Sequence, residues 1–313
     1  MRKIFVAPDG RVRASWRFLL GAFGVVGAEF ASGYIASFIA GGDAPALFVF
    51  LQEPLSLTLT LLIFSFLLTV GDRIPEDRLA AQGLPMRGAW LRQACDGLLL
   101  GAGMVTVCVI AIRLVGGVRF DPHASGHAWM SAAAVLGLLA VGAMKEEVAF
   151  RGYPFQRLVE AGGPKWGPVV GITVLSVLFG LVHWFNPSRT VFSTANTVVI
   201  GVVFSVAYLR TRALWLPFGL HLGWNFTLGV VYGLPVSGIE EFSVIVKGRA
   251  TGPAWLTGGS YGIEASAVAT VVALAALVPI VWLYRAPTLE VVGGERNPKK
   301  ELNSREAAGI QTQ

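Results

Sequence analysis

The sequence predicts an all-α, polytopic membrane protein with about eight transmembrane helices, and two observations lead to this class. Hydrophobic residues make up 54% of the 313 residues and charged residues only 14%, whereas a soluble domain usually carries about 25% charged residues. Apolar runs also recur from one end of the chain to the other, each close to the roughly 20 helical residues that cross a bilayer core. No long polar block is left to form a separate soluble domain.

Eight apolar runs approach the length of a transmembrane helix. They cover approximately residues 17–40, 47–70, 94–115, 129–150, 168–185, 190–209, 213–232 and 263–284. The fifth run is short and the seventh contains Pro217, so these two are the least regular spans. Residues 1–285 are therefore predicted to form one membrane domain, and residues 286–313 a polar, disordered tail.

The basic residues predict the orientation of the chain. The net charge is +6, and with the N-terminus inside, 19 of the 25 Lys and Arg residues fall in the inner loops and ends. Because inner loops are enriched in Lys and Arg, this asymmetry predicts eight spans with both termini cytoplasmic. The expected membrane is of the bacterial inner type. The expected partners are membrane lipids and no nucleic acid, since no basic face is formed.

Two adjacent carboxylates end the fourth run. Glu146 and Glu147 precede Arg151, and the chain could continue as a helix to about residue 160, kinked at Pro154, before turning back. Ionisable groups inside a transmembrane segment are costly and often functional. A helix end that simply reaches water carries charges too, so this segment alone leaves both interpretations open.

Two histidines lie in later runs. Phe179 and His183 are in the fifth run, and a helical hairpin brings His183 to about the depth of Glu146, because both lie roughly 20 to 25 Å from the turn at 1.5 Å per residue. His221 and Asn225 share a helical face in the seventh run, at a somewhat shallower expected depth. A buried His is more often a satisfied core residue, so neither histidine decides the function by itself.

Other polar residues give weaker signals. Glu29 and Glu53 lie in the first two runs and could line a cavity, although no partner is identifiable. His123 and His127 have an i, i+4 spacing seen at metal sites, but they lie in a loop segment without an acidic motif, and a metal role is not expected.

Taken together, the polar residues of runs four, five and seven resemble three motifs of one family. In chain order the motifs are EExxxR, FxxxH and HxxxN, matched by Glu146, Glu147 and Arg151, by Phe179 and His183, and by His221 and Asn225. They resemble those of the CAAX prenyl protease and bacteriocin-processing (CPBP) family, also called the Abi family. The resemblance covers about residues 129–232, and outside this region only the membrane character is similar.

The resemblance implies an α-helical intramembrane endopeptidase that cleaves membrane-associated peptides or proteins. It implies that Glu146 activates water together with His183, and that His221 and Asn225 stabilise the oxyanion. Glu147 and Arg151 match the remaining motif positions, and as an i, i+4 pair they can hold the fourth helix in register.

The metal content is left open by the motifs. No HExxH motif is present, yet Glu146, His183 and His221 could hold a catalytic Zn²⁺ with an open position for water. A metal-free glutamate mechanism would use the same residues. The family's usual label of metalloprotease favours zinc.

Two other functions remain as alternatives. A membrane binding, immunity or scaffold protein could keep the cavity without cleaving peptides. A proton-coupled transporter could use the buried acids, although no inverted repeat of the transporter type is present.

Overall fold

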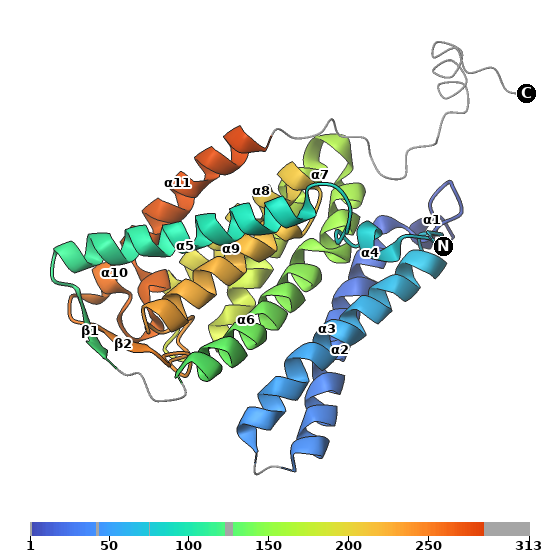
Figure 1. The fold of residues 1–313 in the computed structure, drawn as a ribbon. Helices are drawn as coiled ribbons and strands as arrows, with labels where there is room; N and C mark the ends of the chain where they lie inside the picture. The colour runs from blue at the N-terminus through green and yellow to red at the C-terminus, as the bar shows by residue number, and fades with distance from the viewer. Residues whose placement is uncertain (1, 42–43, 75, 123–127, 285–313) are drawn as a thin grey trace, which may run out of the picture.

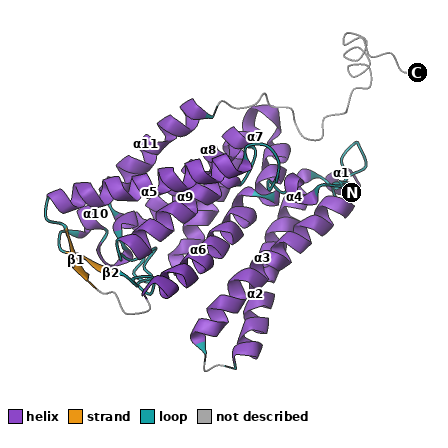
Figure 2. Cartoon of the chain, in the orientation of Figure 1, coloured by secondary structure: helices purple, strands orange, loops and turns teal. Residues whose placement is uncertain are grey.

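The computed structural model describes residues 2–41, 44–74, 76–122 and 128–284. This part of the chain is nearly all helical, with a small two-stranded sheet at one end of the bundle (Figures 1 and 2). The predicted disordered tail and the pair His123 and His127 lie outside the described residues.

The helices and strands occur in the following order along the chain. They are α1 (Arg2–Phe5), α2 (Ala14–Ala40), α3 (Pro45–Val70), α4 (Arg78–Ala81), α5 (Trp90–Leu114), β1 (Val118–Pro122), α6 (Ala128–Arg151), α7 (Tyr153–Val182), η1 (His183–Phe185), α8 (Val191–Thr211), α9 (Trp215–Phe226), η2 (Thr227–Val231), β2 (Val246–Ala250), α10 (Ala254–Thr257), η3 (Gly259–Tyr261), η4 (Ile263–Ala265) and α11 (Ala267–Leu283). β1 and β2 pair antiparallel, with Phe120 opposite Gly248.

Helices lie at all eight predicted runs, but they differ in length. Within the described residues, five segments are long and apolar enough to cross a membrane: Ala14–Ala40, Pro45–Val70, Trp90–Leu114, Ala128–Phe185 and Val191–Thr211. The fourth of these contains both α6 and α7. With 12 residues in α9 and 17 in α11, these helices are shorter, and the total of eight spans stays a prediction.

The kink predicted at Pro154 is a complete break in the helix, and the chain is helical on both sides of it. α6 ends at Arg151, Gly152 breaks the helix, and α7 starts at Tyr153 with Pro154 in its first turn. Proline suits that position because its missing N–H would have no helical partner there. The chain turns back at Gly163, whose φ of 70° kinks α7 just before Pro164, a backbone conformation that glycine adopts at low cost.

α2 and α3 form a hairpin at one side of the bundle, where α3 packs on α6 and α2 on α7 (Figure 1). A buried cluster of charges fixes one end of this hairpin. The guanidinium groups of Arg17 and Arg157 both donate to the carboxylate of Asp72, and the Tyr153 hydroxyl donates to its other oxygen at 2.8 Å. The cluster therefore joins α2, the end of α3 and α7 through one carboxylate.

α5 and α9 run parallel and touch backbone to backbone. Gly97 and Gly101 of α5 face Gly219 and Gly223 of α9, and a Cβ placed on any of the four would lie 2.2 to 2.3 Å from a carbonyl oxygen of the other helix. Small residues four apart on both helices permit such close packing between membrane helices. The contact fixes α9 to the middle of the bundle.

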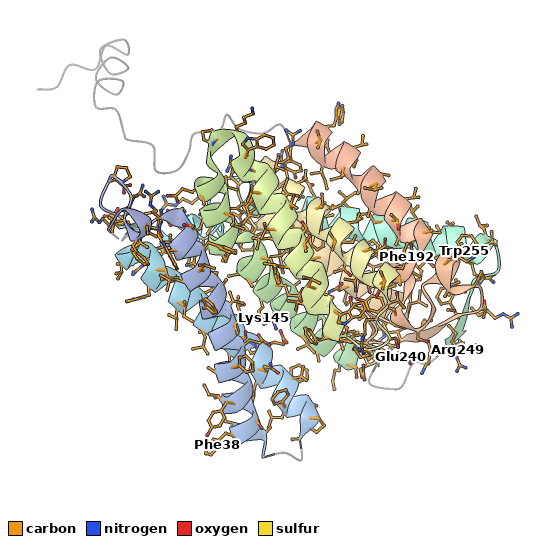
Figure 3. The ribbon with its side chains drawn as sticks, turned by 180° about the vertical axis from the view of Figure 1, so that it is seen from behind. Phe38, Lys145, Phe192, Glu240, Arg249 and Trp255 are labelled. Atoms are coloured by element: carbon orange, nitrogen blue, oxygen red, sulfur yellow. The ribbon has the colours of Figure 1, made fainter. Side chains whose placement is uncertain are left out.

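Large apolar side chains cover the outside of the helices. Phe23, Phe30, Phe38 and Phe185 are 72% to 86% exposed, and Phe38 lies at the far end of the α2–α3 hairpin (Figure 3). Soluble monomers rarely expose apolar side chains over so much of the surface. Such a surface is typical of helices surrounded by lipid.

Candidate active site

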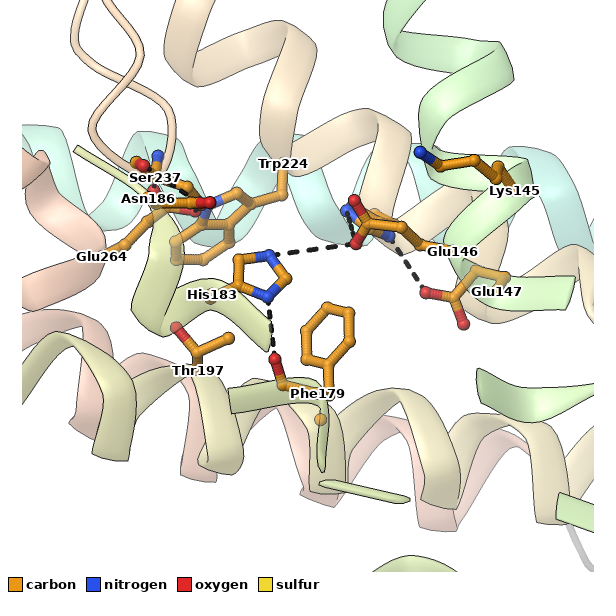
Figure 4. Close-up of polar contacts among 12 residues, drawn as sticks. Lys145, Glu146, Glu147, Phe179, His183, Asn186, Thr197, Trp224, Ser237 and Glu264 are labelled. Atoms are coloured by element: carbon orange, nitrogen blue, oxygen red, sulfur yellow. Dashed lines mark hydrogen bonds and ion pairs between the residues drawn. The ribbon is translucent and has the colours of Figure 1, made fainter. Parts of the chain in front are cut away.

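The predicted site residues meet in one cavity of about 280 Å³. Glu146 of α6, His183 at the start of η1, and His221 and Asn225 of α9 all line it. Figure 4 shows His183 between Glu146 on one side and a group containing Trp224 and Glu264 on the other. The structure thus brings together the four residues of α6, η1 and α9 that the sequence singled out.

Glu146 lies at the centre of this arrangement. Its Oε2 atom is 3.9 Å from Nε2 of His183 and 3.9 Å from Nε2 of His221. These separations are too long for direct hydrogen bonds, but catalytic hydrogen bonds are often long without a substrate and tighten when one binds. One carboxylate oxygen therefore faces two imidazole nitrogens at equal distance.

The other ring nitrogen of each histidine is held by a fixed acceptor. Nδ1 of His183 lies 2.8 Å from the carbonyl oxygen of Phe179, and Nδ1 of His221 lies 3.0 Å from Oε1 of Glu147. Both acceptors require a proton on Nδ1, which fixes the tautomer and aims Nε2 at Glu146.

Glu147 and Arg151 lie behind the cavity and are fully buried. Arg151 donates to Oε1 of Glu147 at 3.3 Å and to the carbonyl oxygen of Gly201 at 3.3 Å, and its guanidinium lies 4.4 Å from the centre of the Phe179 ring. Desolvation makes a buried ion pair costly unless its remaining atoms are hydrogen-bonded, and here Oε2 of Glu147 and Nε of Arg151 are buried without a hydrogen-bond partner. The pair supports His221 from the side opposite to Glu146.

The expected depth mismatch between His183 and His221 is wrong, since both reach the same carboxylate oxygen. The estimate assumed straight helices measured from the ends of loops. The kink at Gly163 redirects α7, and the glycine contact with α5 holds α9 in place, so distances along the chain do not give the depth.

Glu264 is a cavity residue that the sequence did not identify. Its Oε1 accepts from Nε1 of Trp224 at 3.1 Å and from Oγ of Ser237 at 3.2 Å, and its Oε2 accepts from the backbone N–H of Ser237. Glu264 lies outside the five candidate spans. Burial raises the pKa of its carboxyl to about 7, although the hydrogen bonds from Ser237 and Trp224 oppose that rise.

Lys145 connects the cavity to the α2–α3 hairpin (Figure 3). Its Nζ lies 2.9 Å from a carboxylate oxygen of Glu53, which lines the cavity, and 3.5 Å from Glu29. Glu29 also accepts from Gln52 at 2.9 Å and from Ser56 at 2.6 Å. The two acids of the first runs therefore form a polar network next to Glu146.

The residues proposed for zinc have suitable chemistry, and their side chains lie slightly further apart than the ligands of a bound zinc ion. A carboxylate and two Nε2 atoms are zinc ligands, and two ligands of a tetrahedral zinc ion lie about 3.4 Å apart, whereas Glu146 is 3.9 Å from each imidazole. Over residues 2–41, 44–74, 76–122 and 128–284, no group of three or more His, Cys, Asp or Glu side chains is placed to hold a metal ion.

The family comparison covers the part of the chain that forms this cavity. Residues 128–227 match the family model described as Type II CAAX prenyl endopeptidase Rce1-like. The Rce1-like segment starts at the first residue of α6 and ends just after α9, so it contains the four predicted cavity residues. The match confirms the resemblance to the CPBP family, and with the apolar helices it indicates an integral membrane protein. Comparisons with curated proteins and with solved structures find no significant match.

Proposed function

We propose that this chain is an intramembrane endopeptidase that hydrolyses membrane-associated peptides or proteins with a water activated by Glu146. The observation that carries the proposal is the placement of one Glu146 oxygen at 3.9 Å from both His183 and His221, inside the Rce1-like segment. Peptide hydrolysis needs a base close to the attacking water and donors close to the developing oxyanion. The cavity supplies side chains for both tasks.

In the proposed reaction, Glu146 takes a proton from a water molecule that His183 helps to orient. The water oxygen forms a bond to the carbonyl carbon of the scissile peptide, and the carbonyl oxygen becomes an oxyanion. The C–N bond then breaks, and Glu146 returns the proton to the departing amine nitrogen. The products are a carboxylic acid and an amine, and transfer of the acid proton to the amine gives a carboxylate and an ammonium group, so atoms and charge balance.

His221 and Asn225 are proposed to bind the oxyanion. Because Nδ1 of His221 donates to Glu147, its Nε2 can donate only when the ring carries a second proton. Glu147 and Glu146 lie on either side of this ring and would stabilise the imidazolium. Arg151 then keeps Glu147 oriented, which makes Glu147 and Arg151 positioning residues.

The substrate and the membrane topology are part of the same proposal. The family description names CAAX prenyl endopeptidases, and a prenylated C-terminal peptide is one candidate among membrane-associated peptides.

The positions of the basic residues favour eight spans with both termini cytoplasmic, in a bacterial-type inner membrane. Cysteine accessibility on the two sides of the membrane would test this orientation.

The test of the activity is cleavage of a membrane-embedded peptide library by purified protein. Glu146→Gln and His183→Ala should each lower kcat/KM at least about 100-fold, the usual contribution of a general base. Glu241→Gln, which changes an exposed carboxylate outside the cavity, should leave it unchanged. Full activity of both cavity variants would disprove the mechanism. If Glu146→Gln abolishes cleavage but cells keep their biological phenotype, a binding or scaffold protein is favoured. Substrate flux into proteoliposomes would favour a transporter.

Zinc at Glu146, His183 and His221 is kept as a separate proposal, supported by the chemistry of these three side chains. When bound there, zinc would supply an activated water. Elemental analysis of active protein, before and after treatment with a chelator, decides it. A stoichiometric metal that is lost together with activity would support zinc, and full activity of metal-free protein would exclude it.

A further inference from the structure

A single loop separates the proposed catalytic cavity from a second pocket. We name residues 234–242 the partition segment. Four residues of this segment line the cavity of Glu146: Val236, Ser237, Ile239 and Phe242. Three others, Leu234, Pro235 and Glu240, line a neighbouring pocket of about 470 Å³. The second pocket is bounded on its other side by β2 and by the η3 region.

One carboxylate fixes the partition segment at its middle. Both the backbone N–H and the hydroxyl of Ser237 donate to Glu264, which also accepts from Trp224 of α9. Figure 4 shows Ser237, Trp224 and Glu264 grouped beside His183. Glu264 therefore holds the segment through both a backbone and a side-chain hydrogen bond.

Further contacts hold Glu264 and Ser237 in place. The side-chain amide of Asn196 donates to the carbonyl oxygen of Glu264 at 2.8 Å, and that of Asn186 donates to the carbonyl oxygen of Ser237 at 3.2 Å. The next residue, Gly238, donates its backbone N–H to Tyr261 at 2.8 Å. These contacts come from α8, from the segment after η1 and from η3, so the closed position is fixed from several directions.

We propose that Glu264 is a positioning and specificity-determining residue, which holds the partition segment closed and so limits how many substrate residues fit beyond the scissile bond. This inference rests on the proposed peptidase function. The volume of the cavity, about 280 Å³, is just below the range of typical ligand sites, which measure roughly 300–1,000 Å³. Because the partition segment lines both pockets, a substrate chain that leaves the cavity on this side meets the segment before it can enter the second pocket.

The experiment compares two membrane-embedded peptides that share one scissile sequence and differ only in the length of chain on the partition side. Wild-type protein should cleave the short peptide with the higher kcat/KM. Glu264→Ala should reduce this preference at least about tenfold, because the segment loses both hydrogen bonds that Ser237 donates to this carboxylate. Ser237→Ala, which removes only the hydroxyl, should reduce it by a smaller factor. Glu241→Gln, on the same segment but exposed, should not change it.

The ratio between the two peptides separates this role from a purely structural one. An equal loss of cleavage of both peptides in Glu264→Ala would overturn the proposal, as would an unchanged ratio in a folded variant, and in either case the peptidase function would stand. If Glu264→Ala does not fold, the ratio measured with Ser237→Ala decides.

A wild-type chain that cleaves neither peptide would instead remove the proposed function. Binding of the same labelled peptides, followed by fluorescence anisotropy, then tests the partition segment without cleavage. Tighter relative binding of the long peptide by Glu264→Ala supports the proposal, and identical binding ratios overturn it.

Discussion

The glycine contact between α5 and α9 gives the sharpest prediction, which concerns Gly101→Ala. A Cβ at Gly101 would lie 2.3 Å from the carbonyl oxygen of Leu220 and 2.8 Å from the backbone nitrogen of Trp224, whereas ordinary contacts begin at 3.4 Å. The two helices must therefore separate by about 1 Å locally. Leu220 and Trp224 directly precede His221 and Asn225 in the chain, so the shift falls on the proposed oxyanion-binding residues.

The magnitude follows from this displacement. A misplacement of about 1 Å in an active site can cost about 100-fold in rate, or about 3 kcal/mol of transition-state stabilisation. In addition, overpacking a tight contact typically lowers the free energy of unfolding by about 1 to 3 kcal/mol. Gly101→Ala should therefore lower kcat/KM by about two orders of magnitude and also lower the thermal unfolding midpoint.

The assay is peptide cleavage combined with thermal unfolding of the purified protein in detergent. Gly103→Ala is the matched control, because it lies on the same helix and a Cβ there meets nothing within 4 Å. Alanine has a higher helix propensity than glycine, so the control should be as stable as wild type or more stable. Wild-type activity and stability in Gly101→Ala would refute the view that α5 positions α9.

Three further predictions concern buried charges, and each is checked by thermal unfolding in detergent. Arg151→Met should destabilise the protein by about 3 to 5 kcal/mol, because it leaves the buried carboxylate of Glu147 without its cation. Adding Glu147→Gln should restore part of the lost stability. No recovery of stability in the double variant would argue against this ion pair. Asp72→Asn should cost a similar amount, since two guanidinium groups lose their shared carboxylate, and exposed Glu76→Gln is the control. Because folding raises the pKa of Glu264 from 4.5 to about 7, the folded protein binds an extra proton between these values. The unfolding free energy should therefore fall by up to about 3 kcal/mol as the pH rises through this window, and an equal fall in Glu264→Gln would contradict the assignment.

The sequence predicted the helical class, the helix positions and the main cavity residues because these depend on local patterns. Apolar runs of bilayer length locate the helices, and the three short motifs place Glu146, His183 and His221 on them. Their convergence depends on how the helices pack, which the motifs indicate only through the family resemblance.

Features that depend on tertiary contacts were missed. Glu264 lies at the very start of the last apolar run, ahead of helix α11, and belongs to no motif. Only its position, a lone acid at the edge of an apolar segment, could have drawn attention to it. The glycine pairs of α5 and α9 did carry a signal, since Gly97 and Gly101, and likewise Gly219 and Gly223, have the GxxxG spacing of closely packed membrane helices. Their parallel pairing could not be read from either segment alone.

The contact between α5 and α9 also has a consequence for the biogenesis of the protein. The 12 residues of α9 and the 5 of η2, which continues it directly, make 17, at the lower limit for crossing a hydrocarbon core of about 30 Å, and most of their apolar side chains are buried inside the protein. α5 precedes it in the chain and is therefore synthesised first. We expect α9 to insert stably into the bilayer only after α5 has inserted. Substitution of Gly97 or Gly101 of α5 should therefore impair membrane integration of the C-terminal part of the chain in cells.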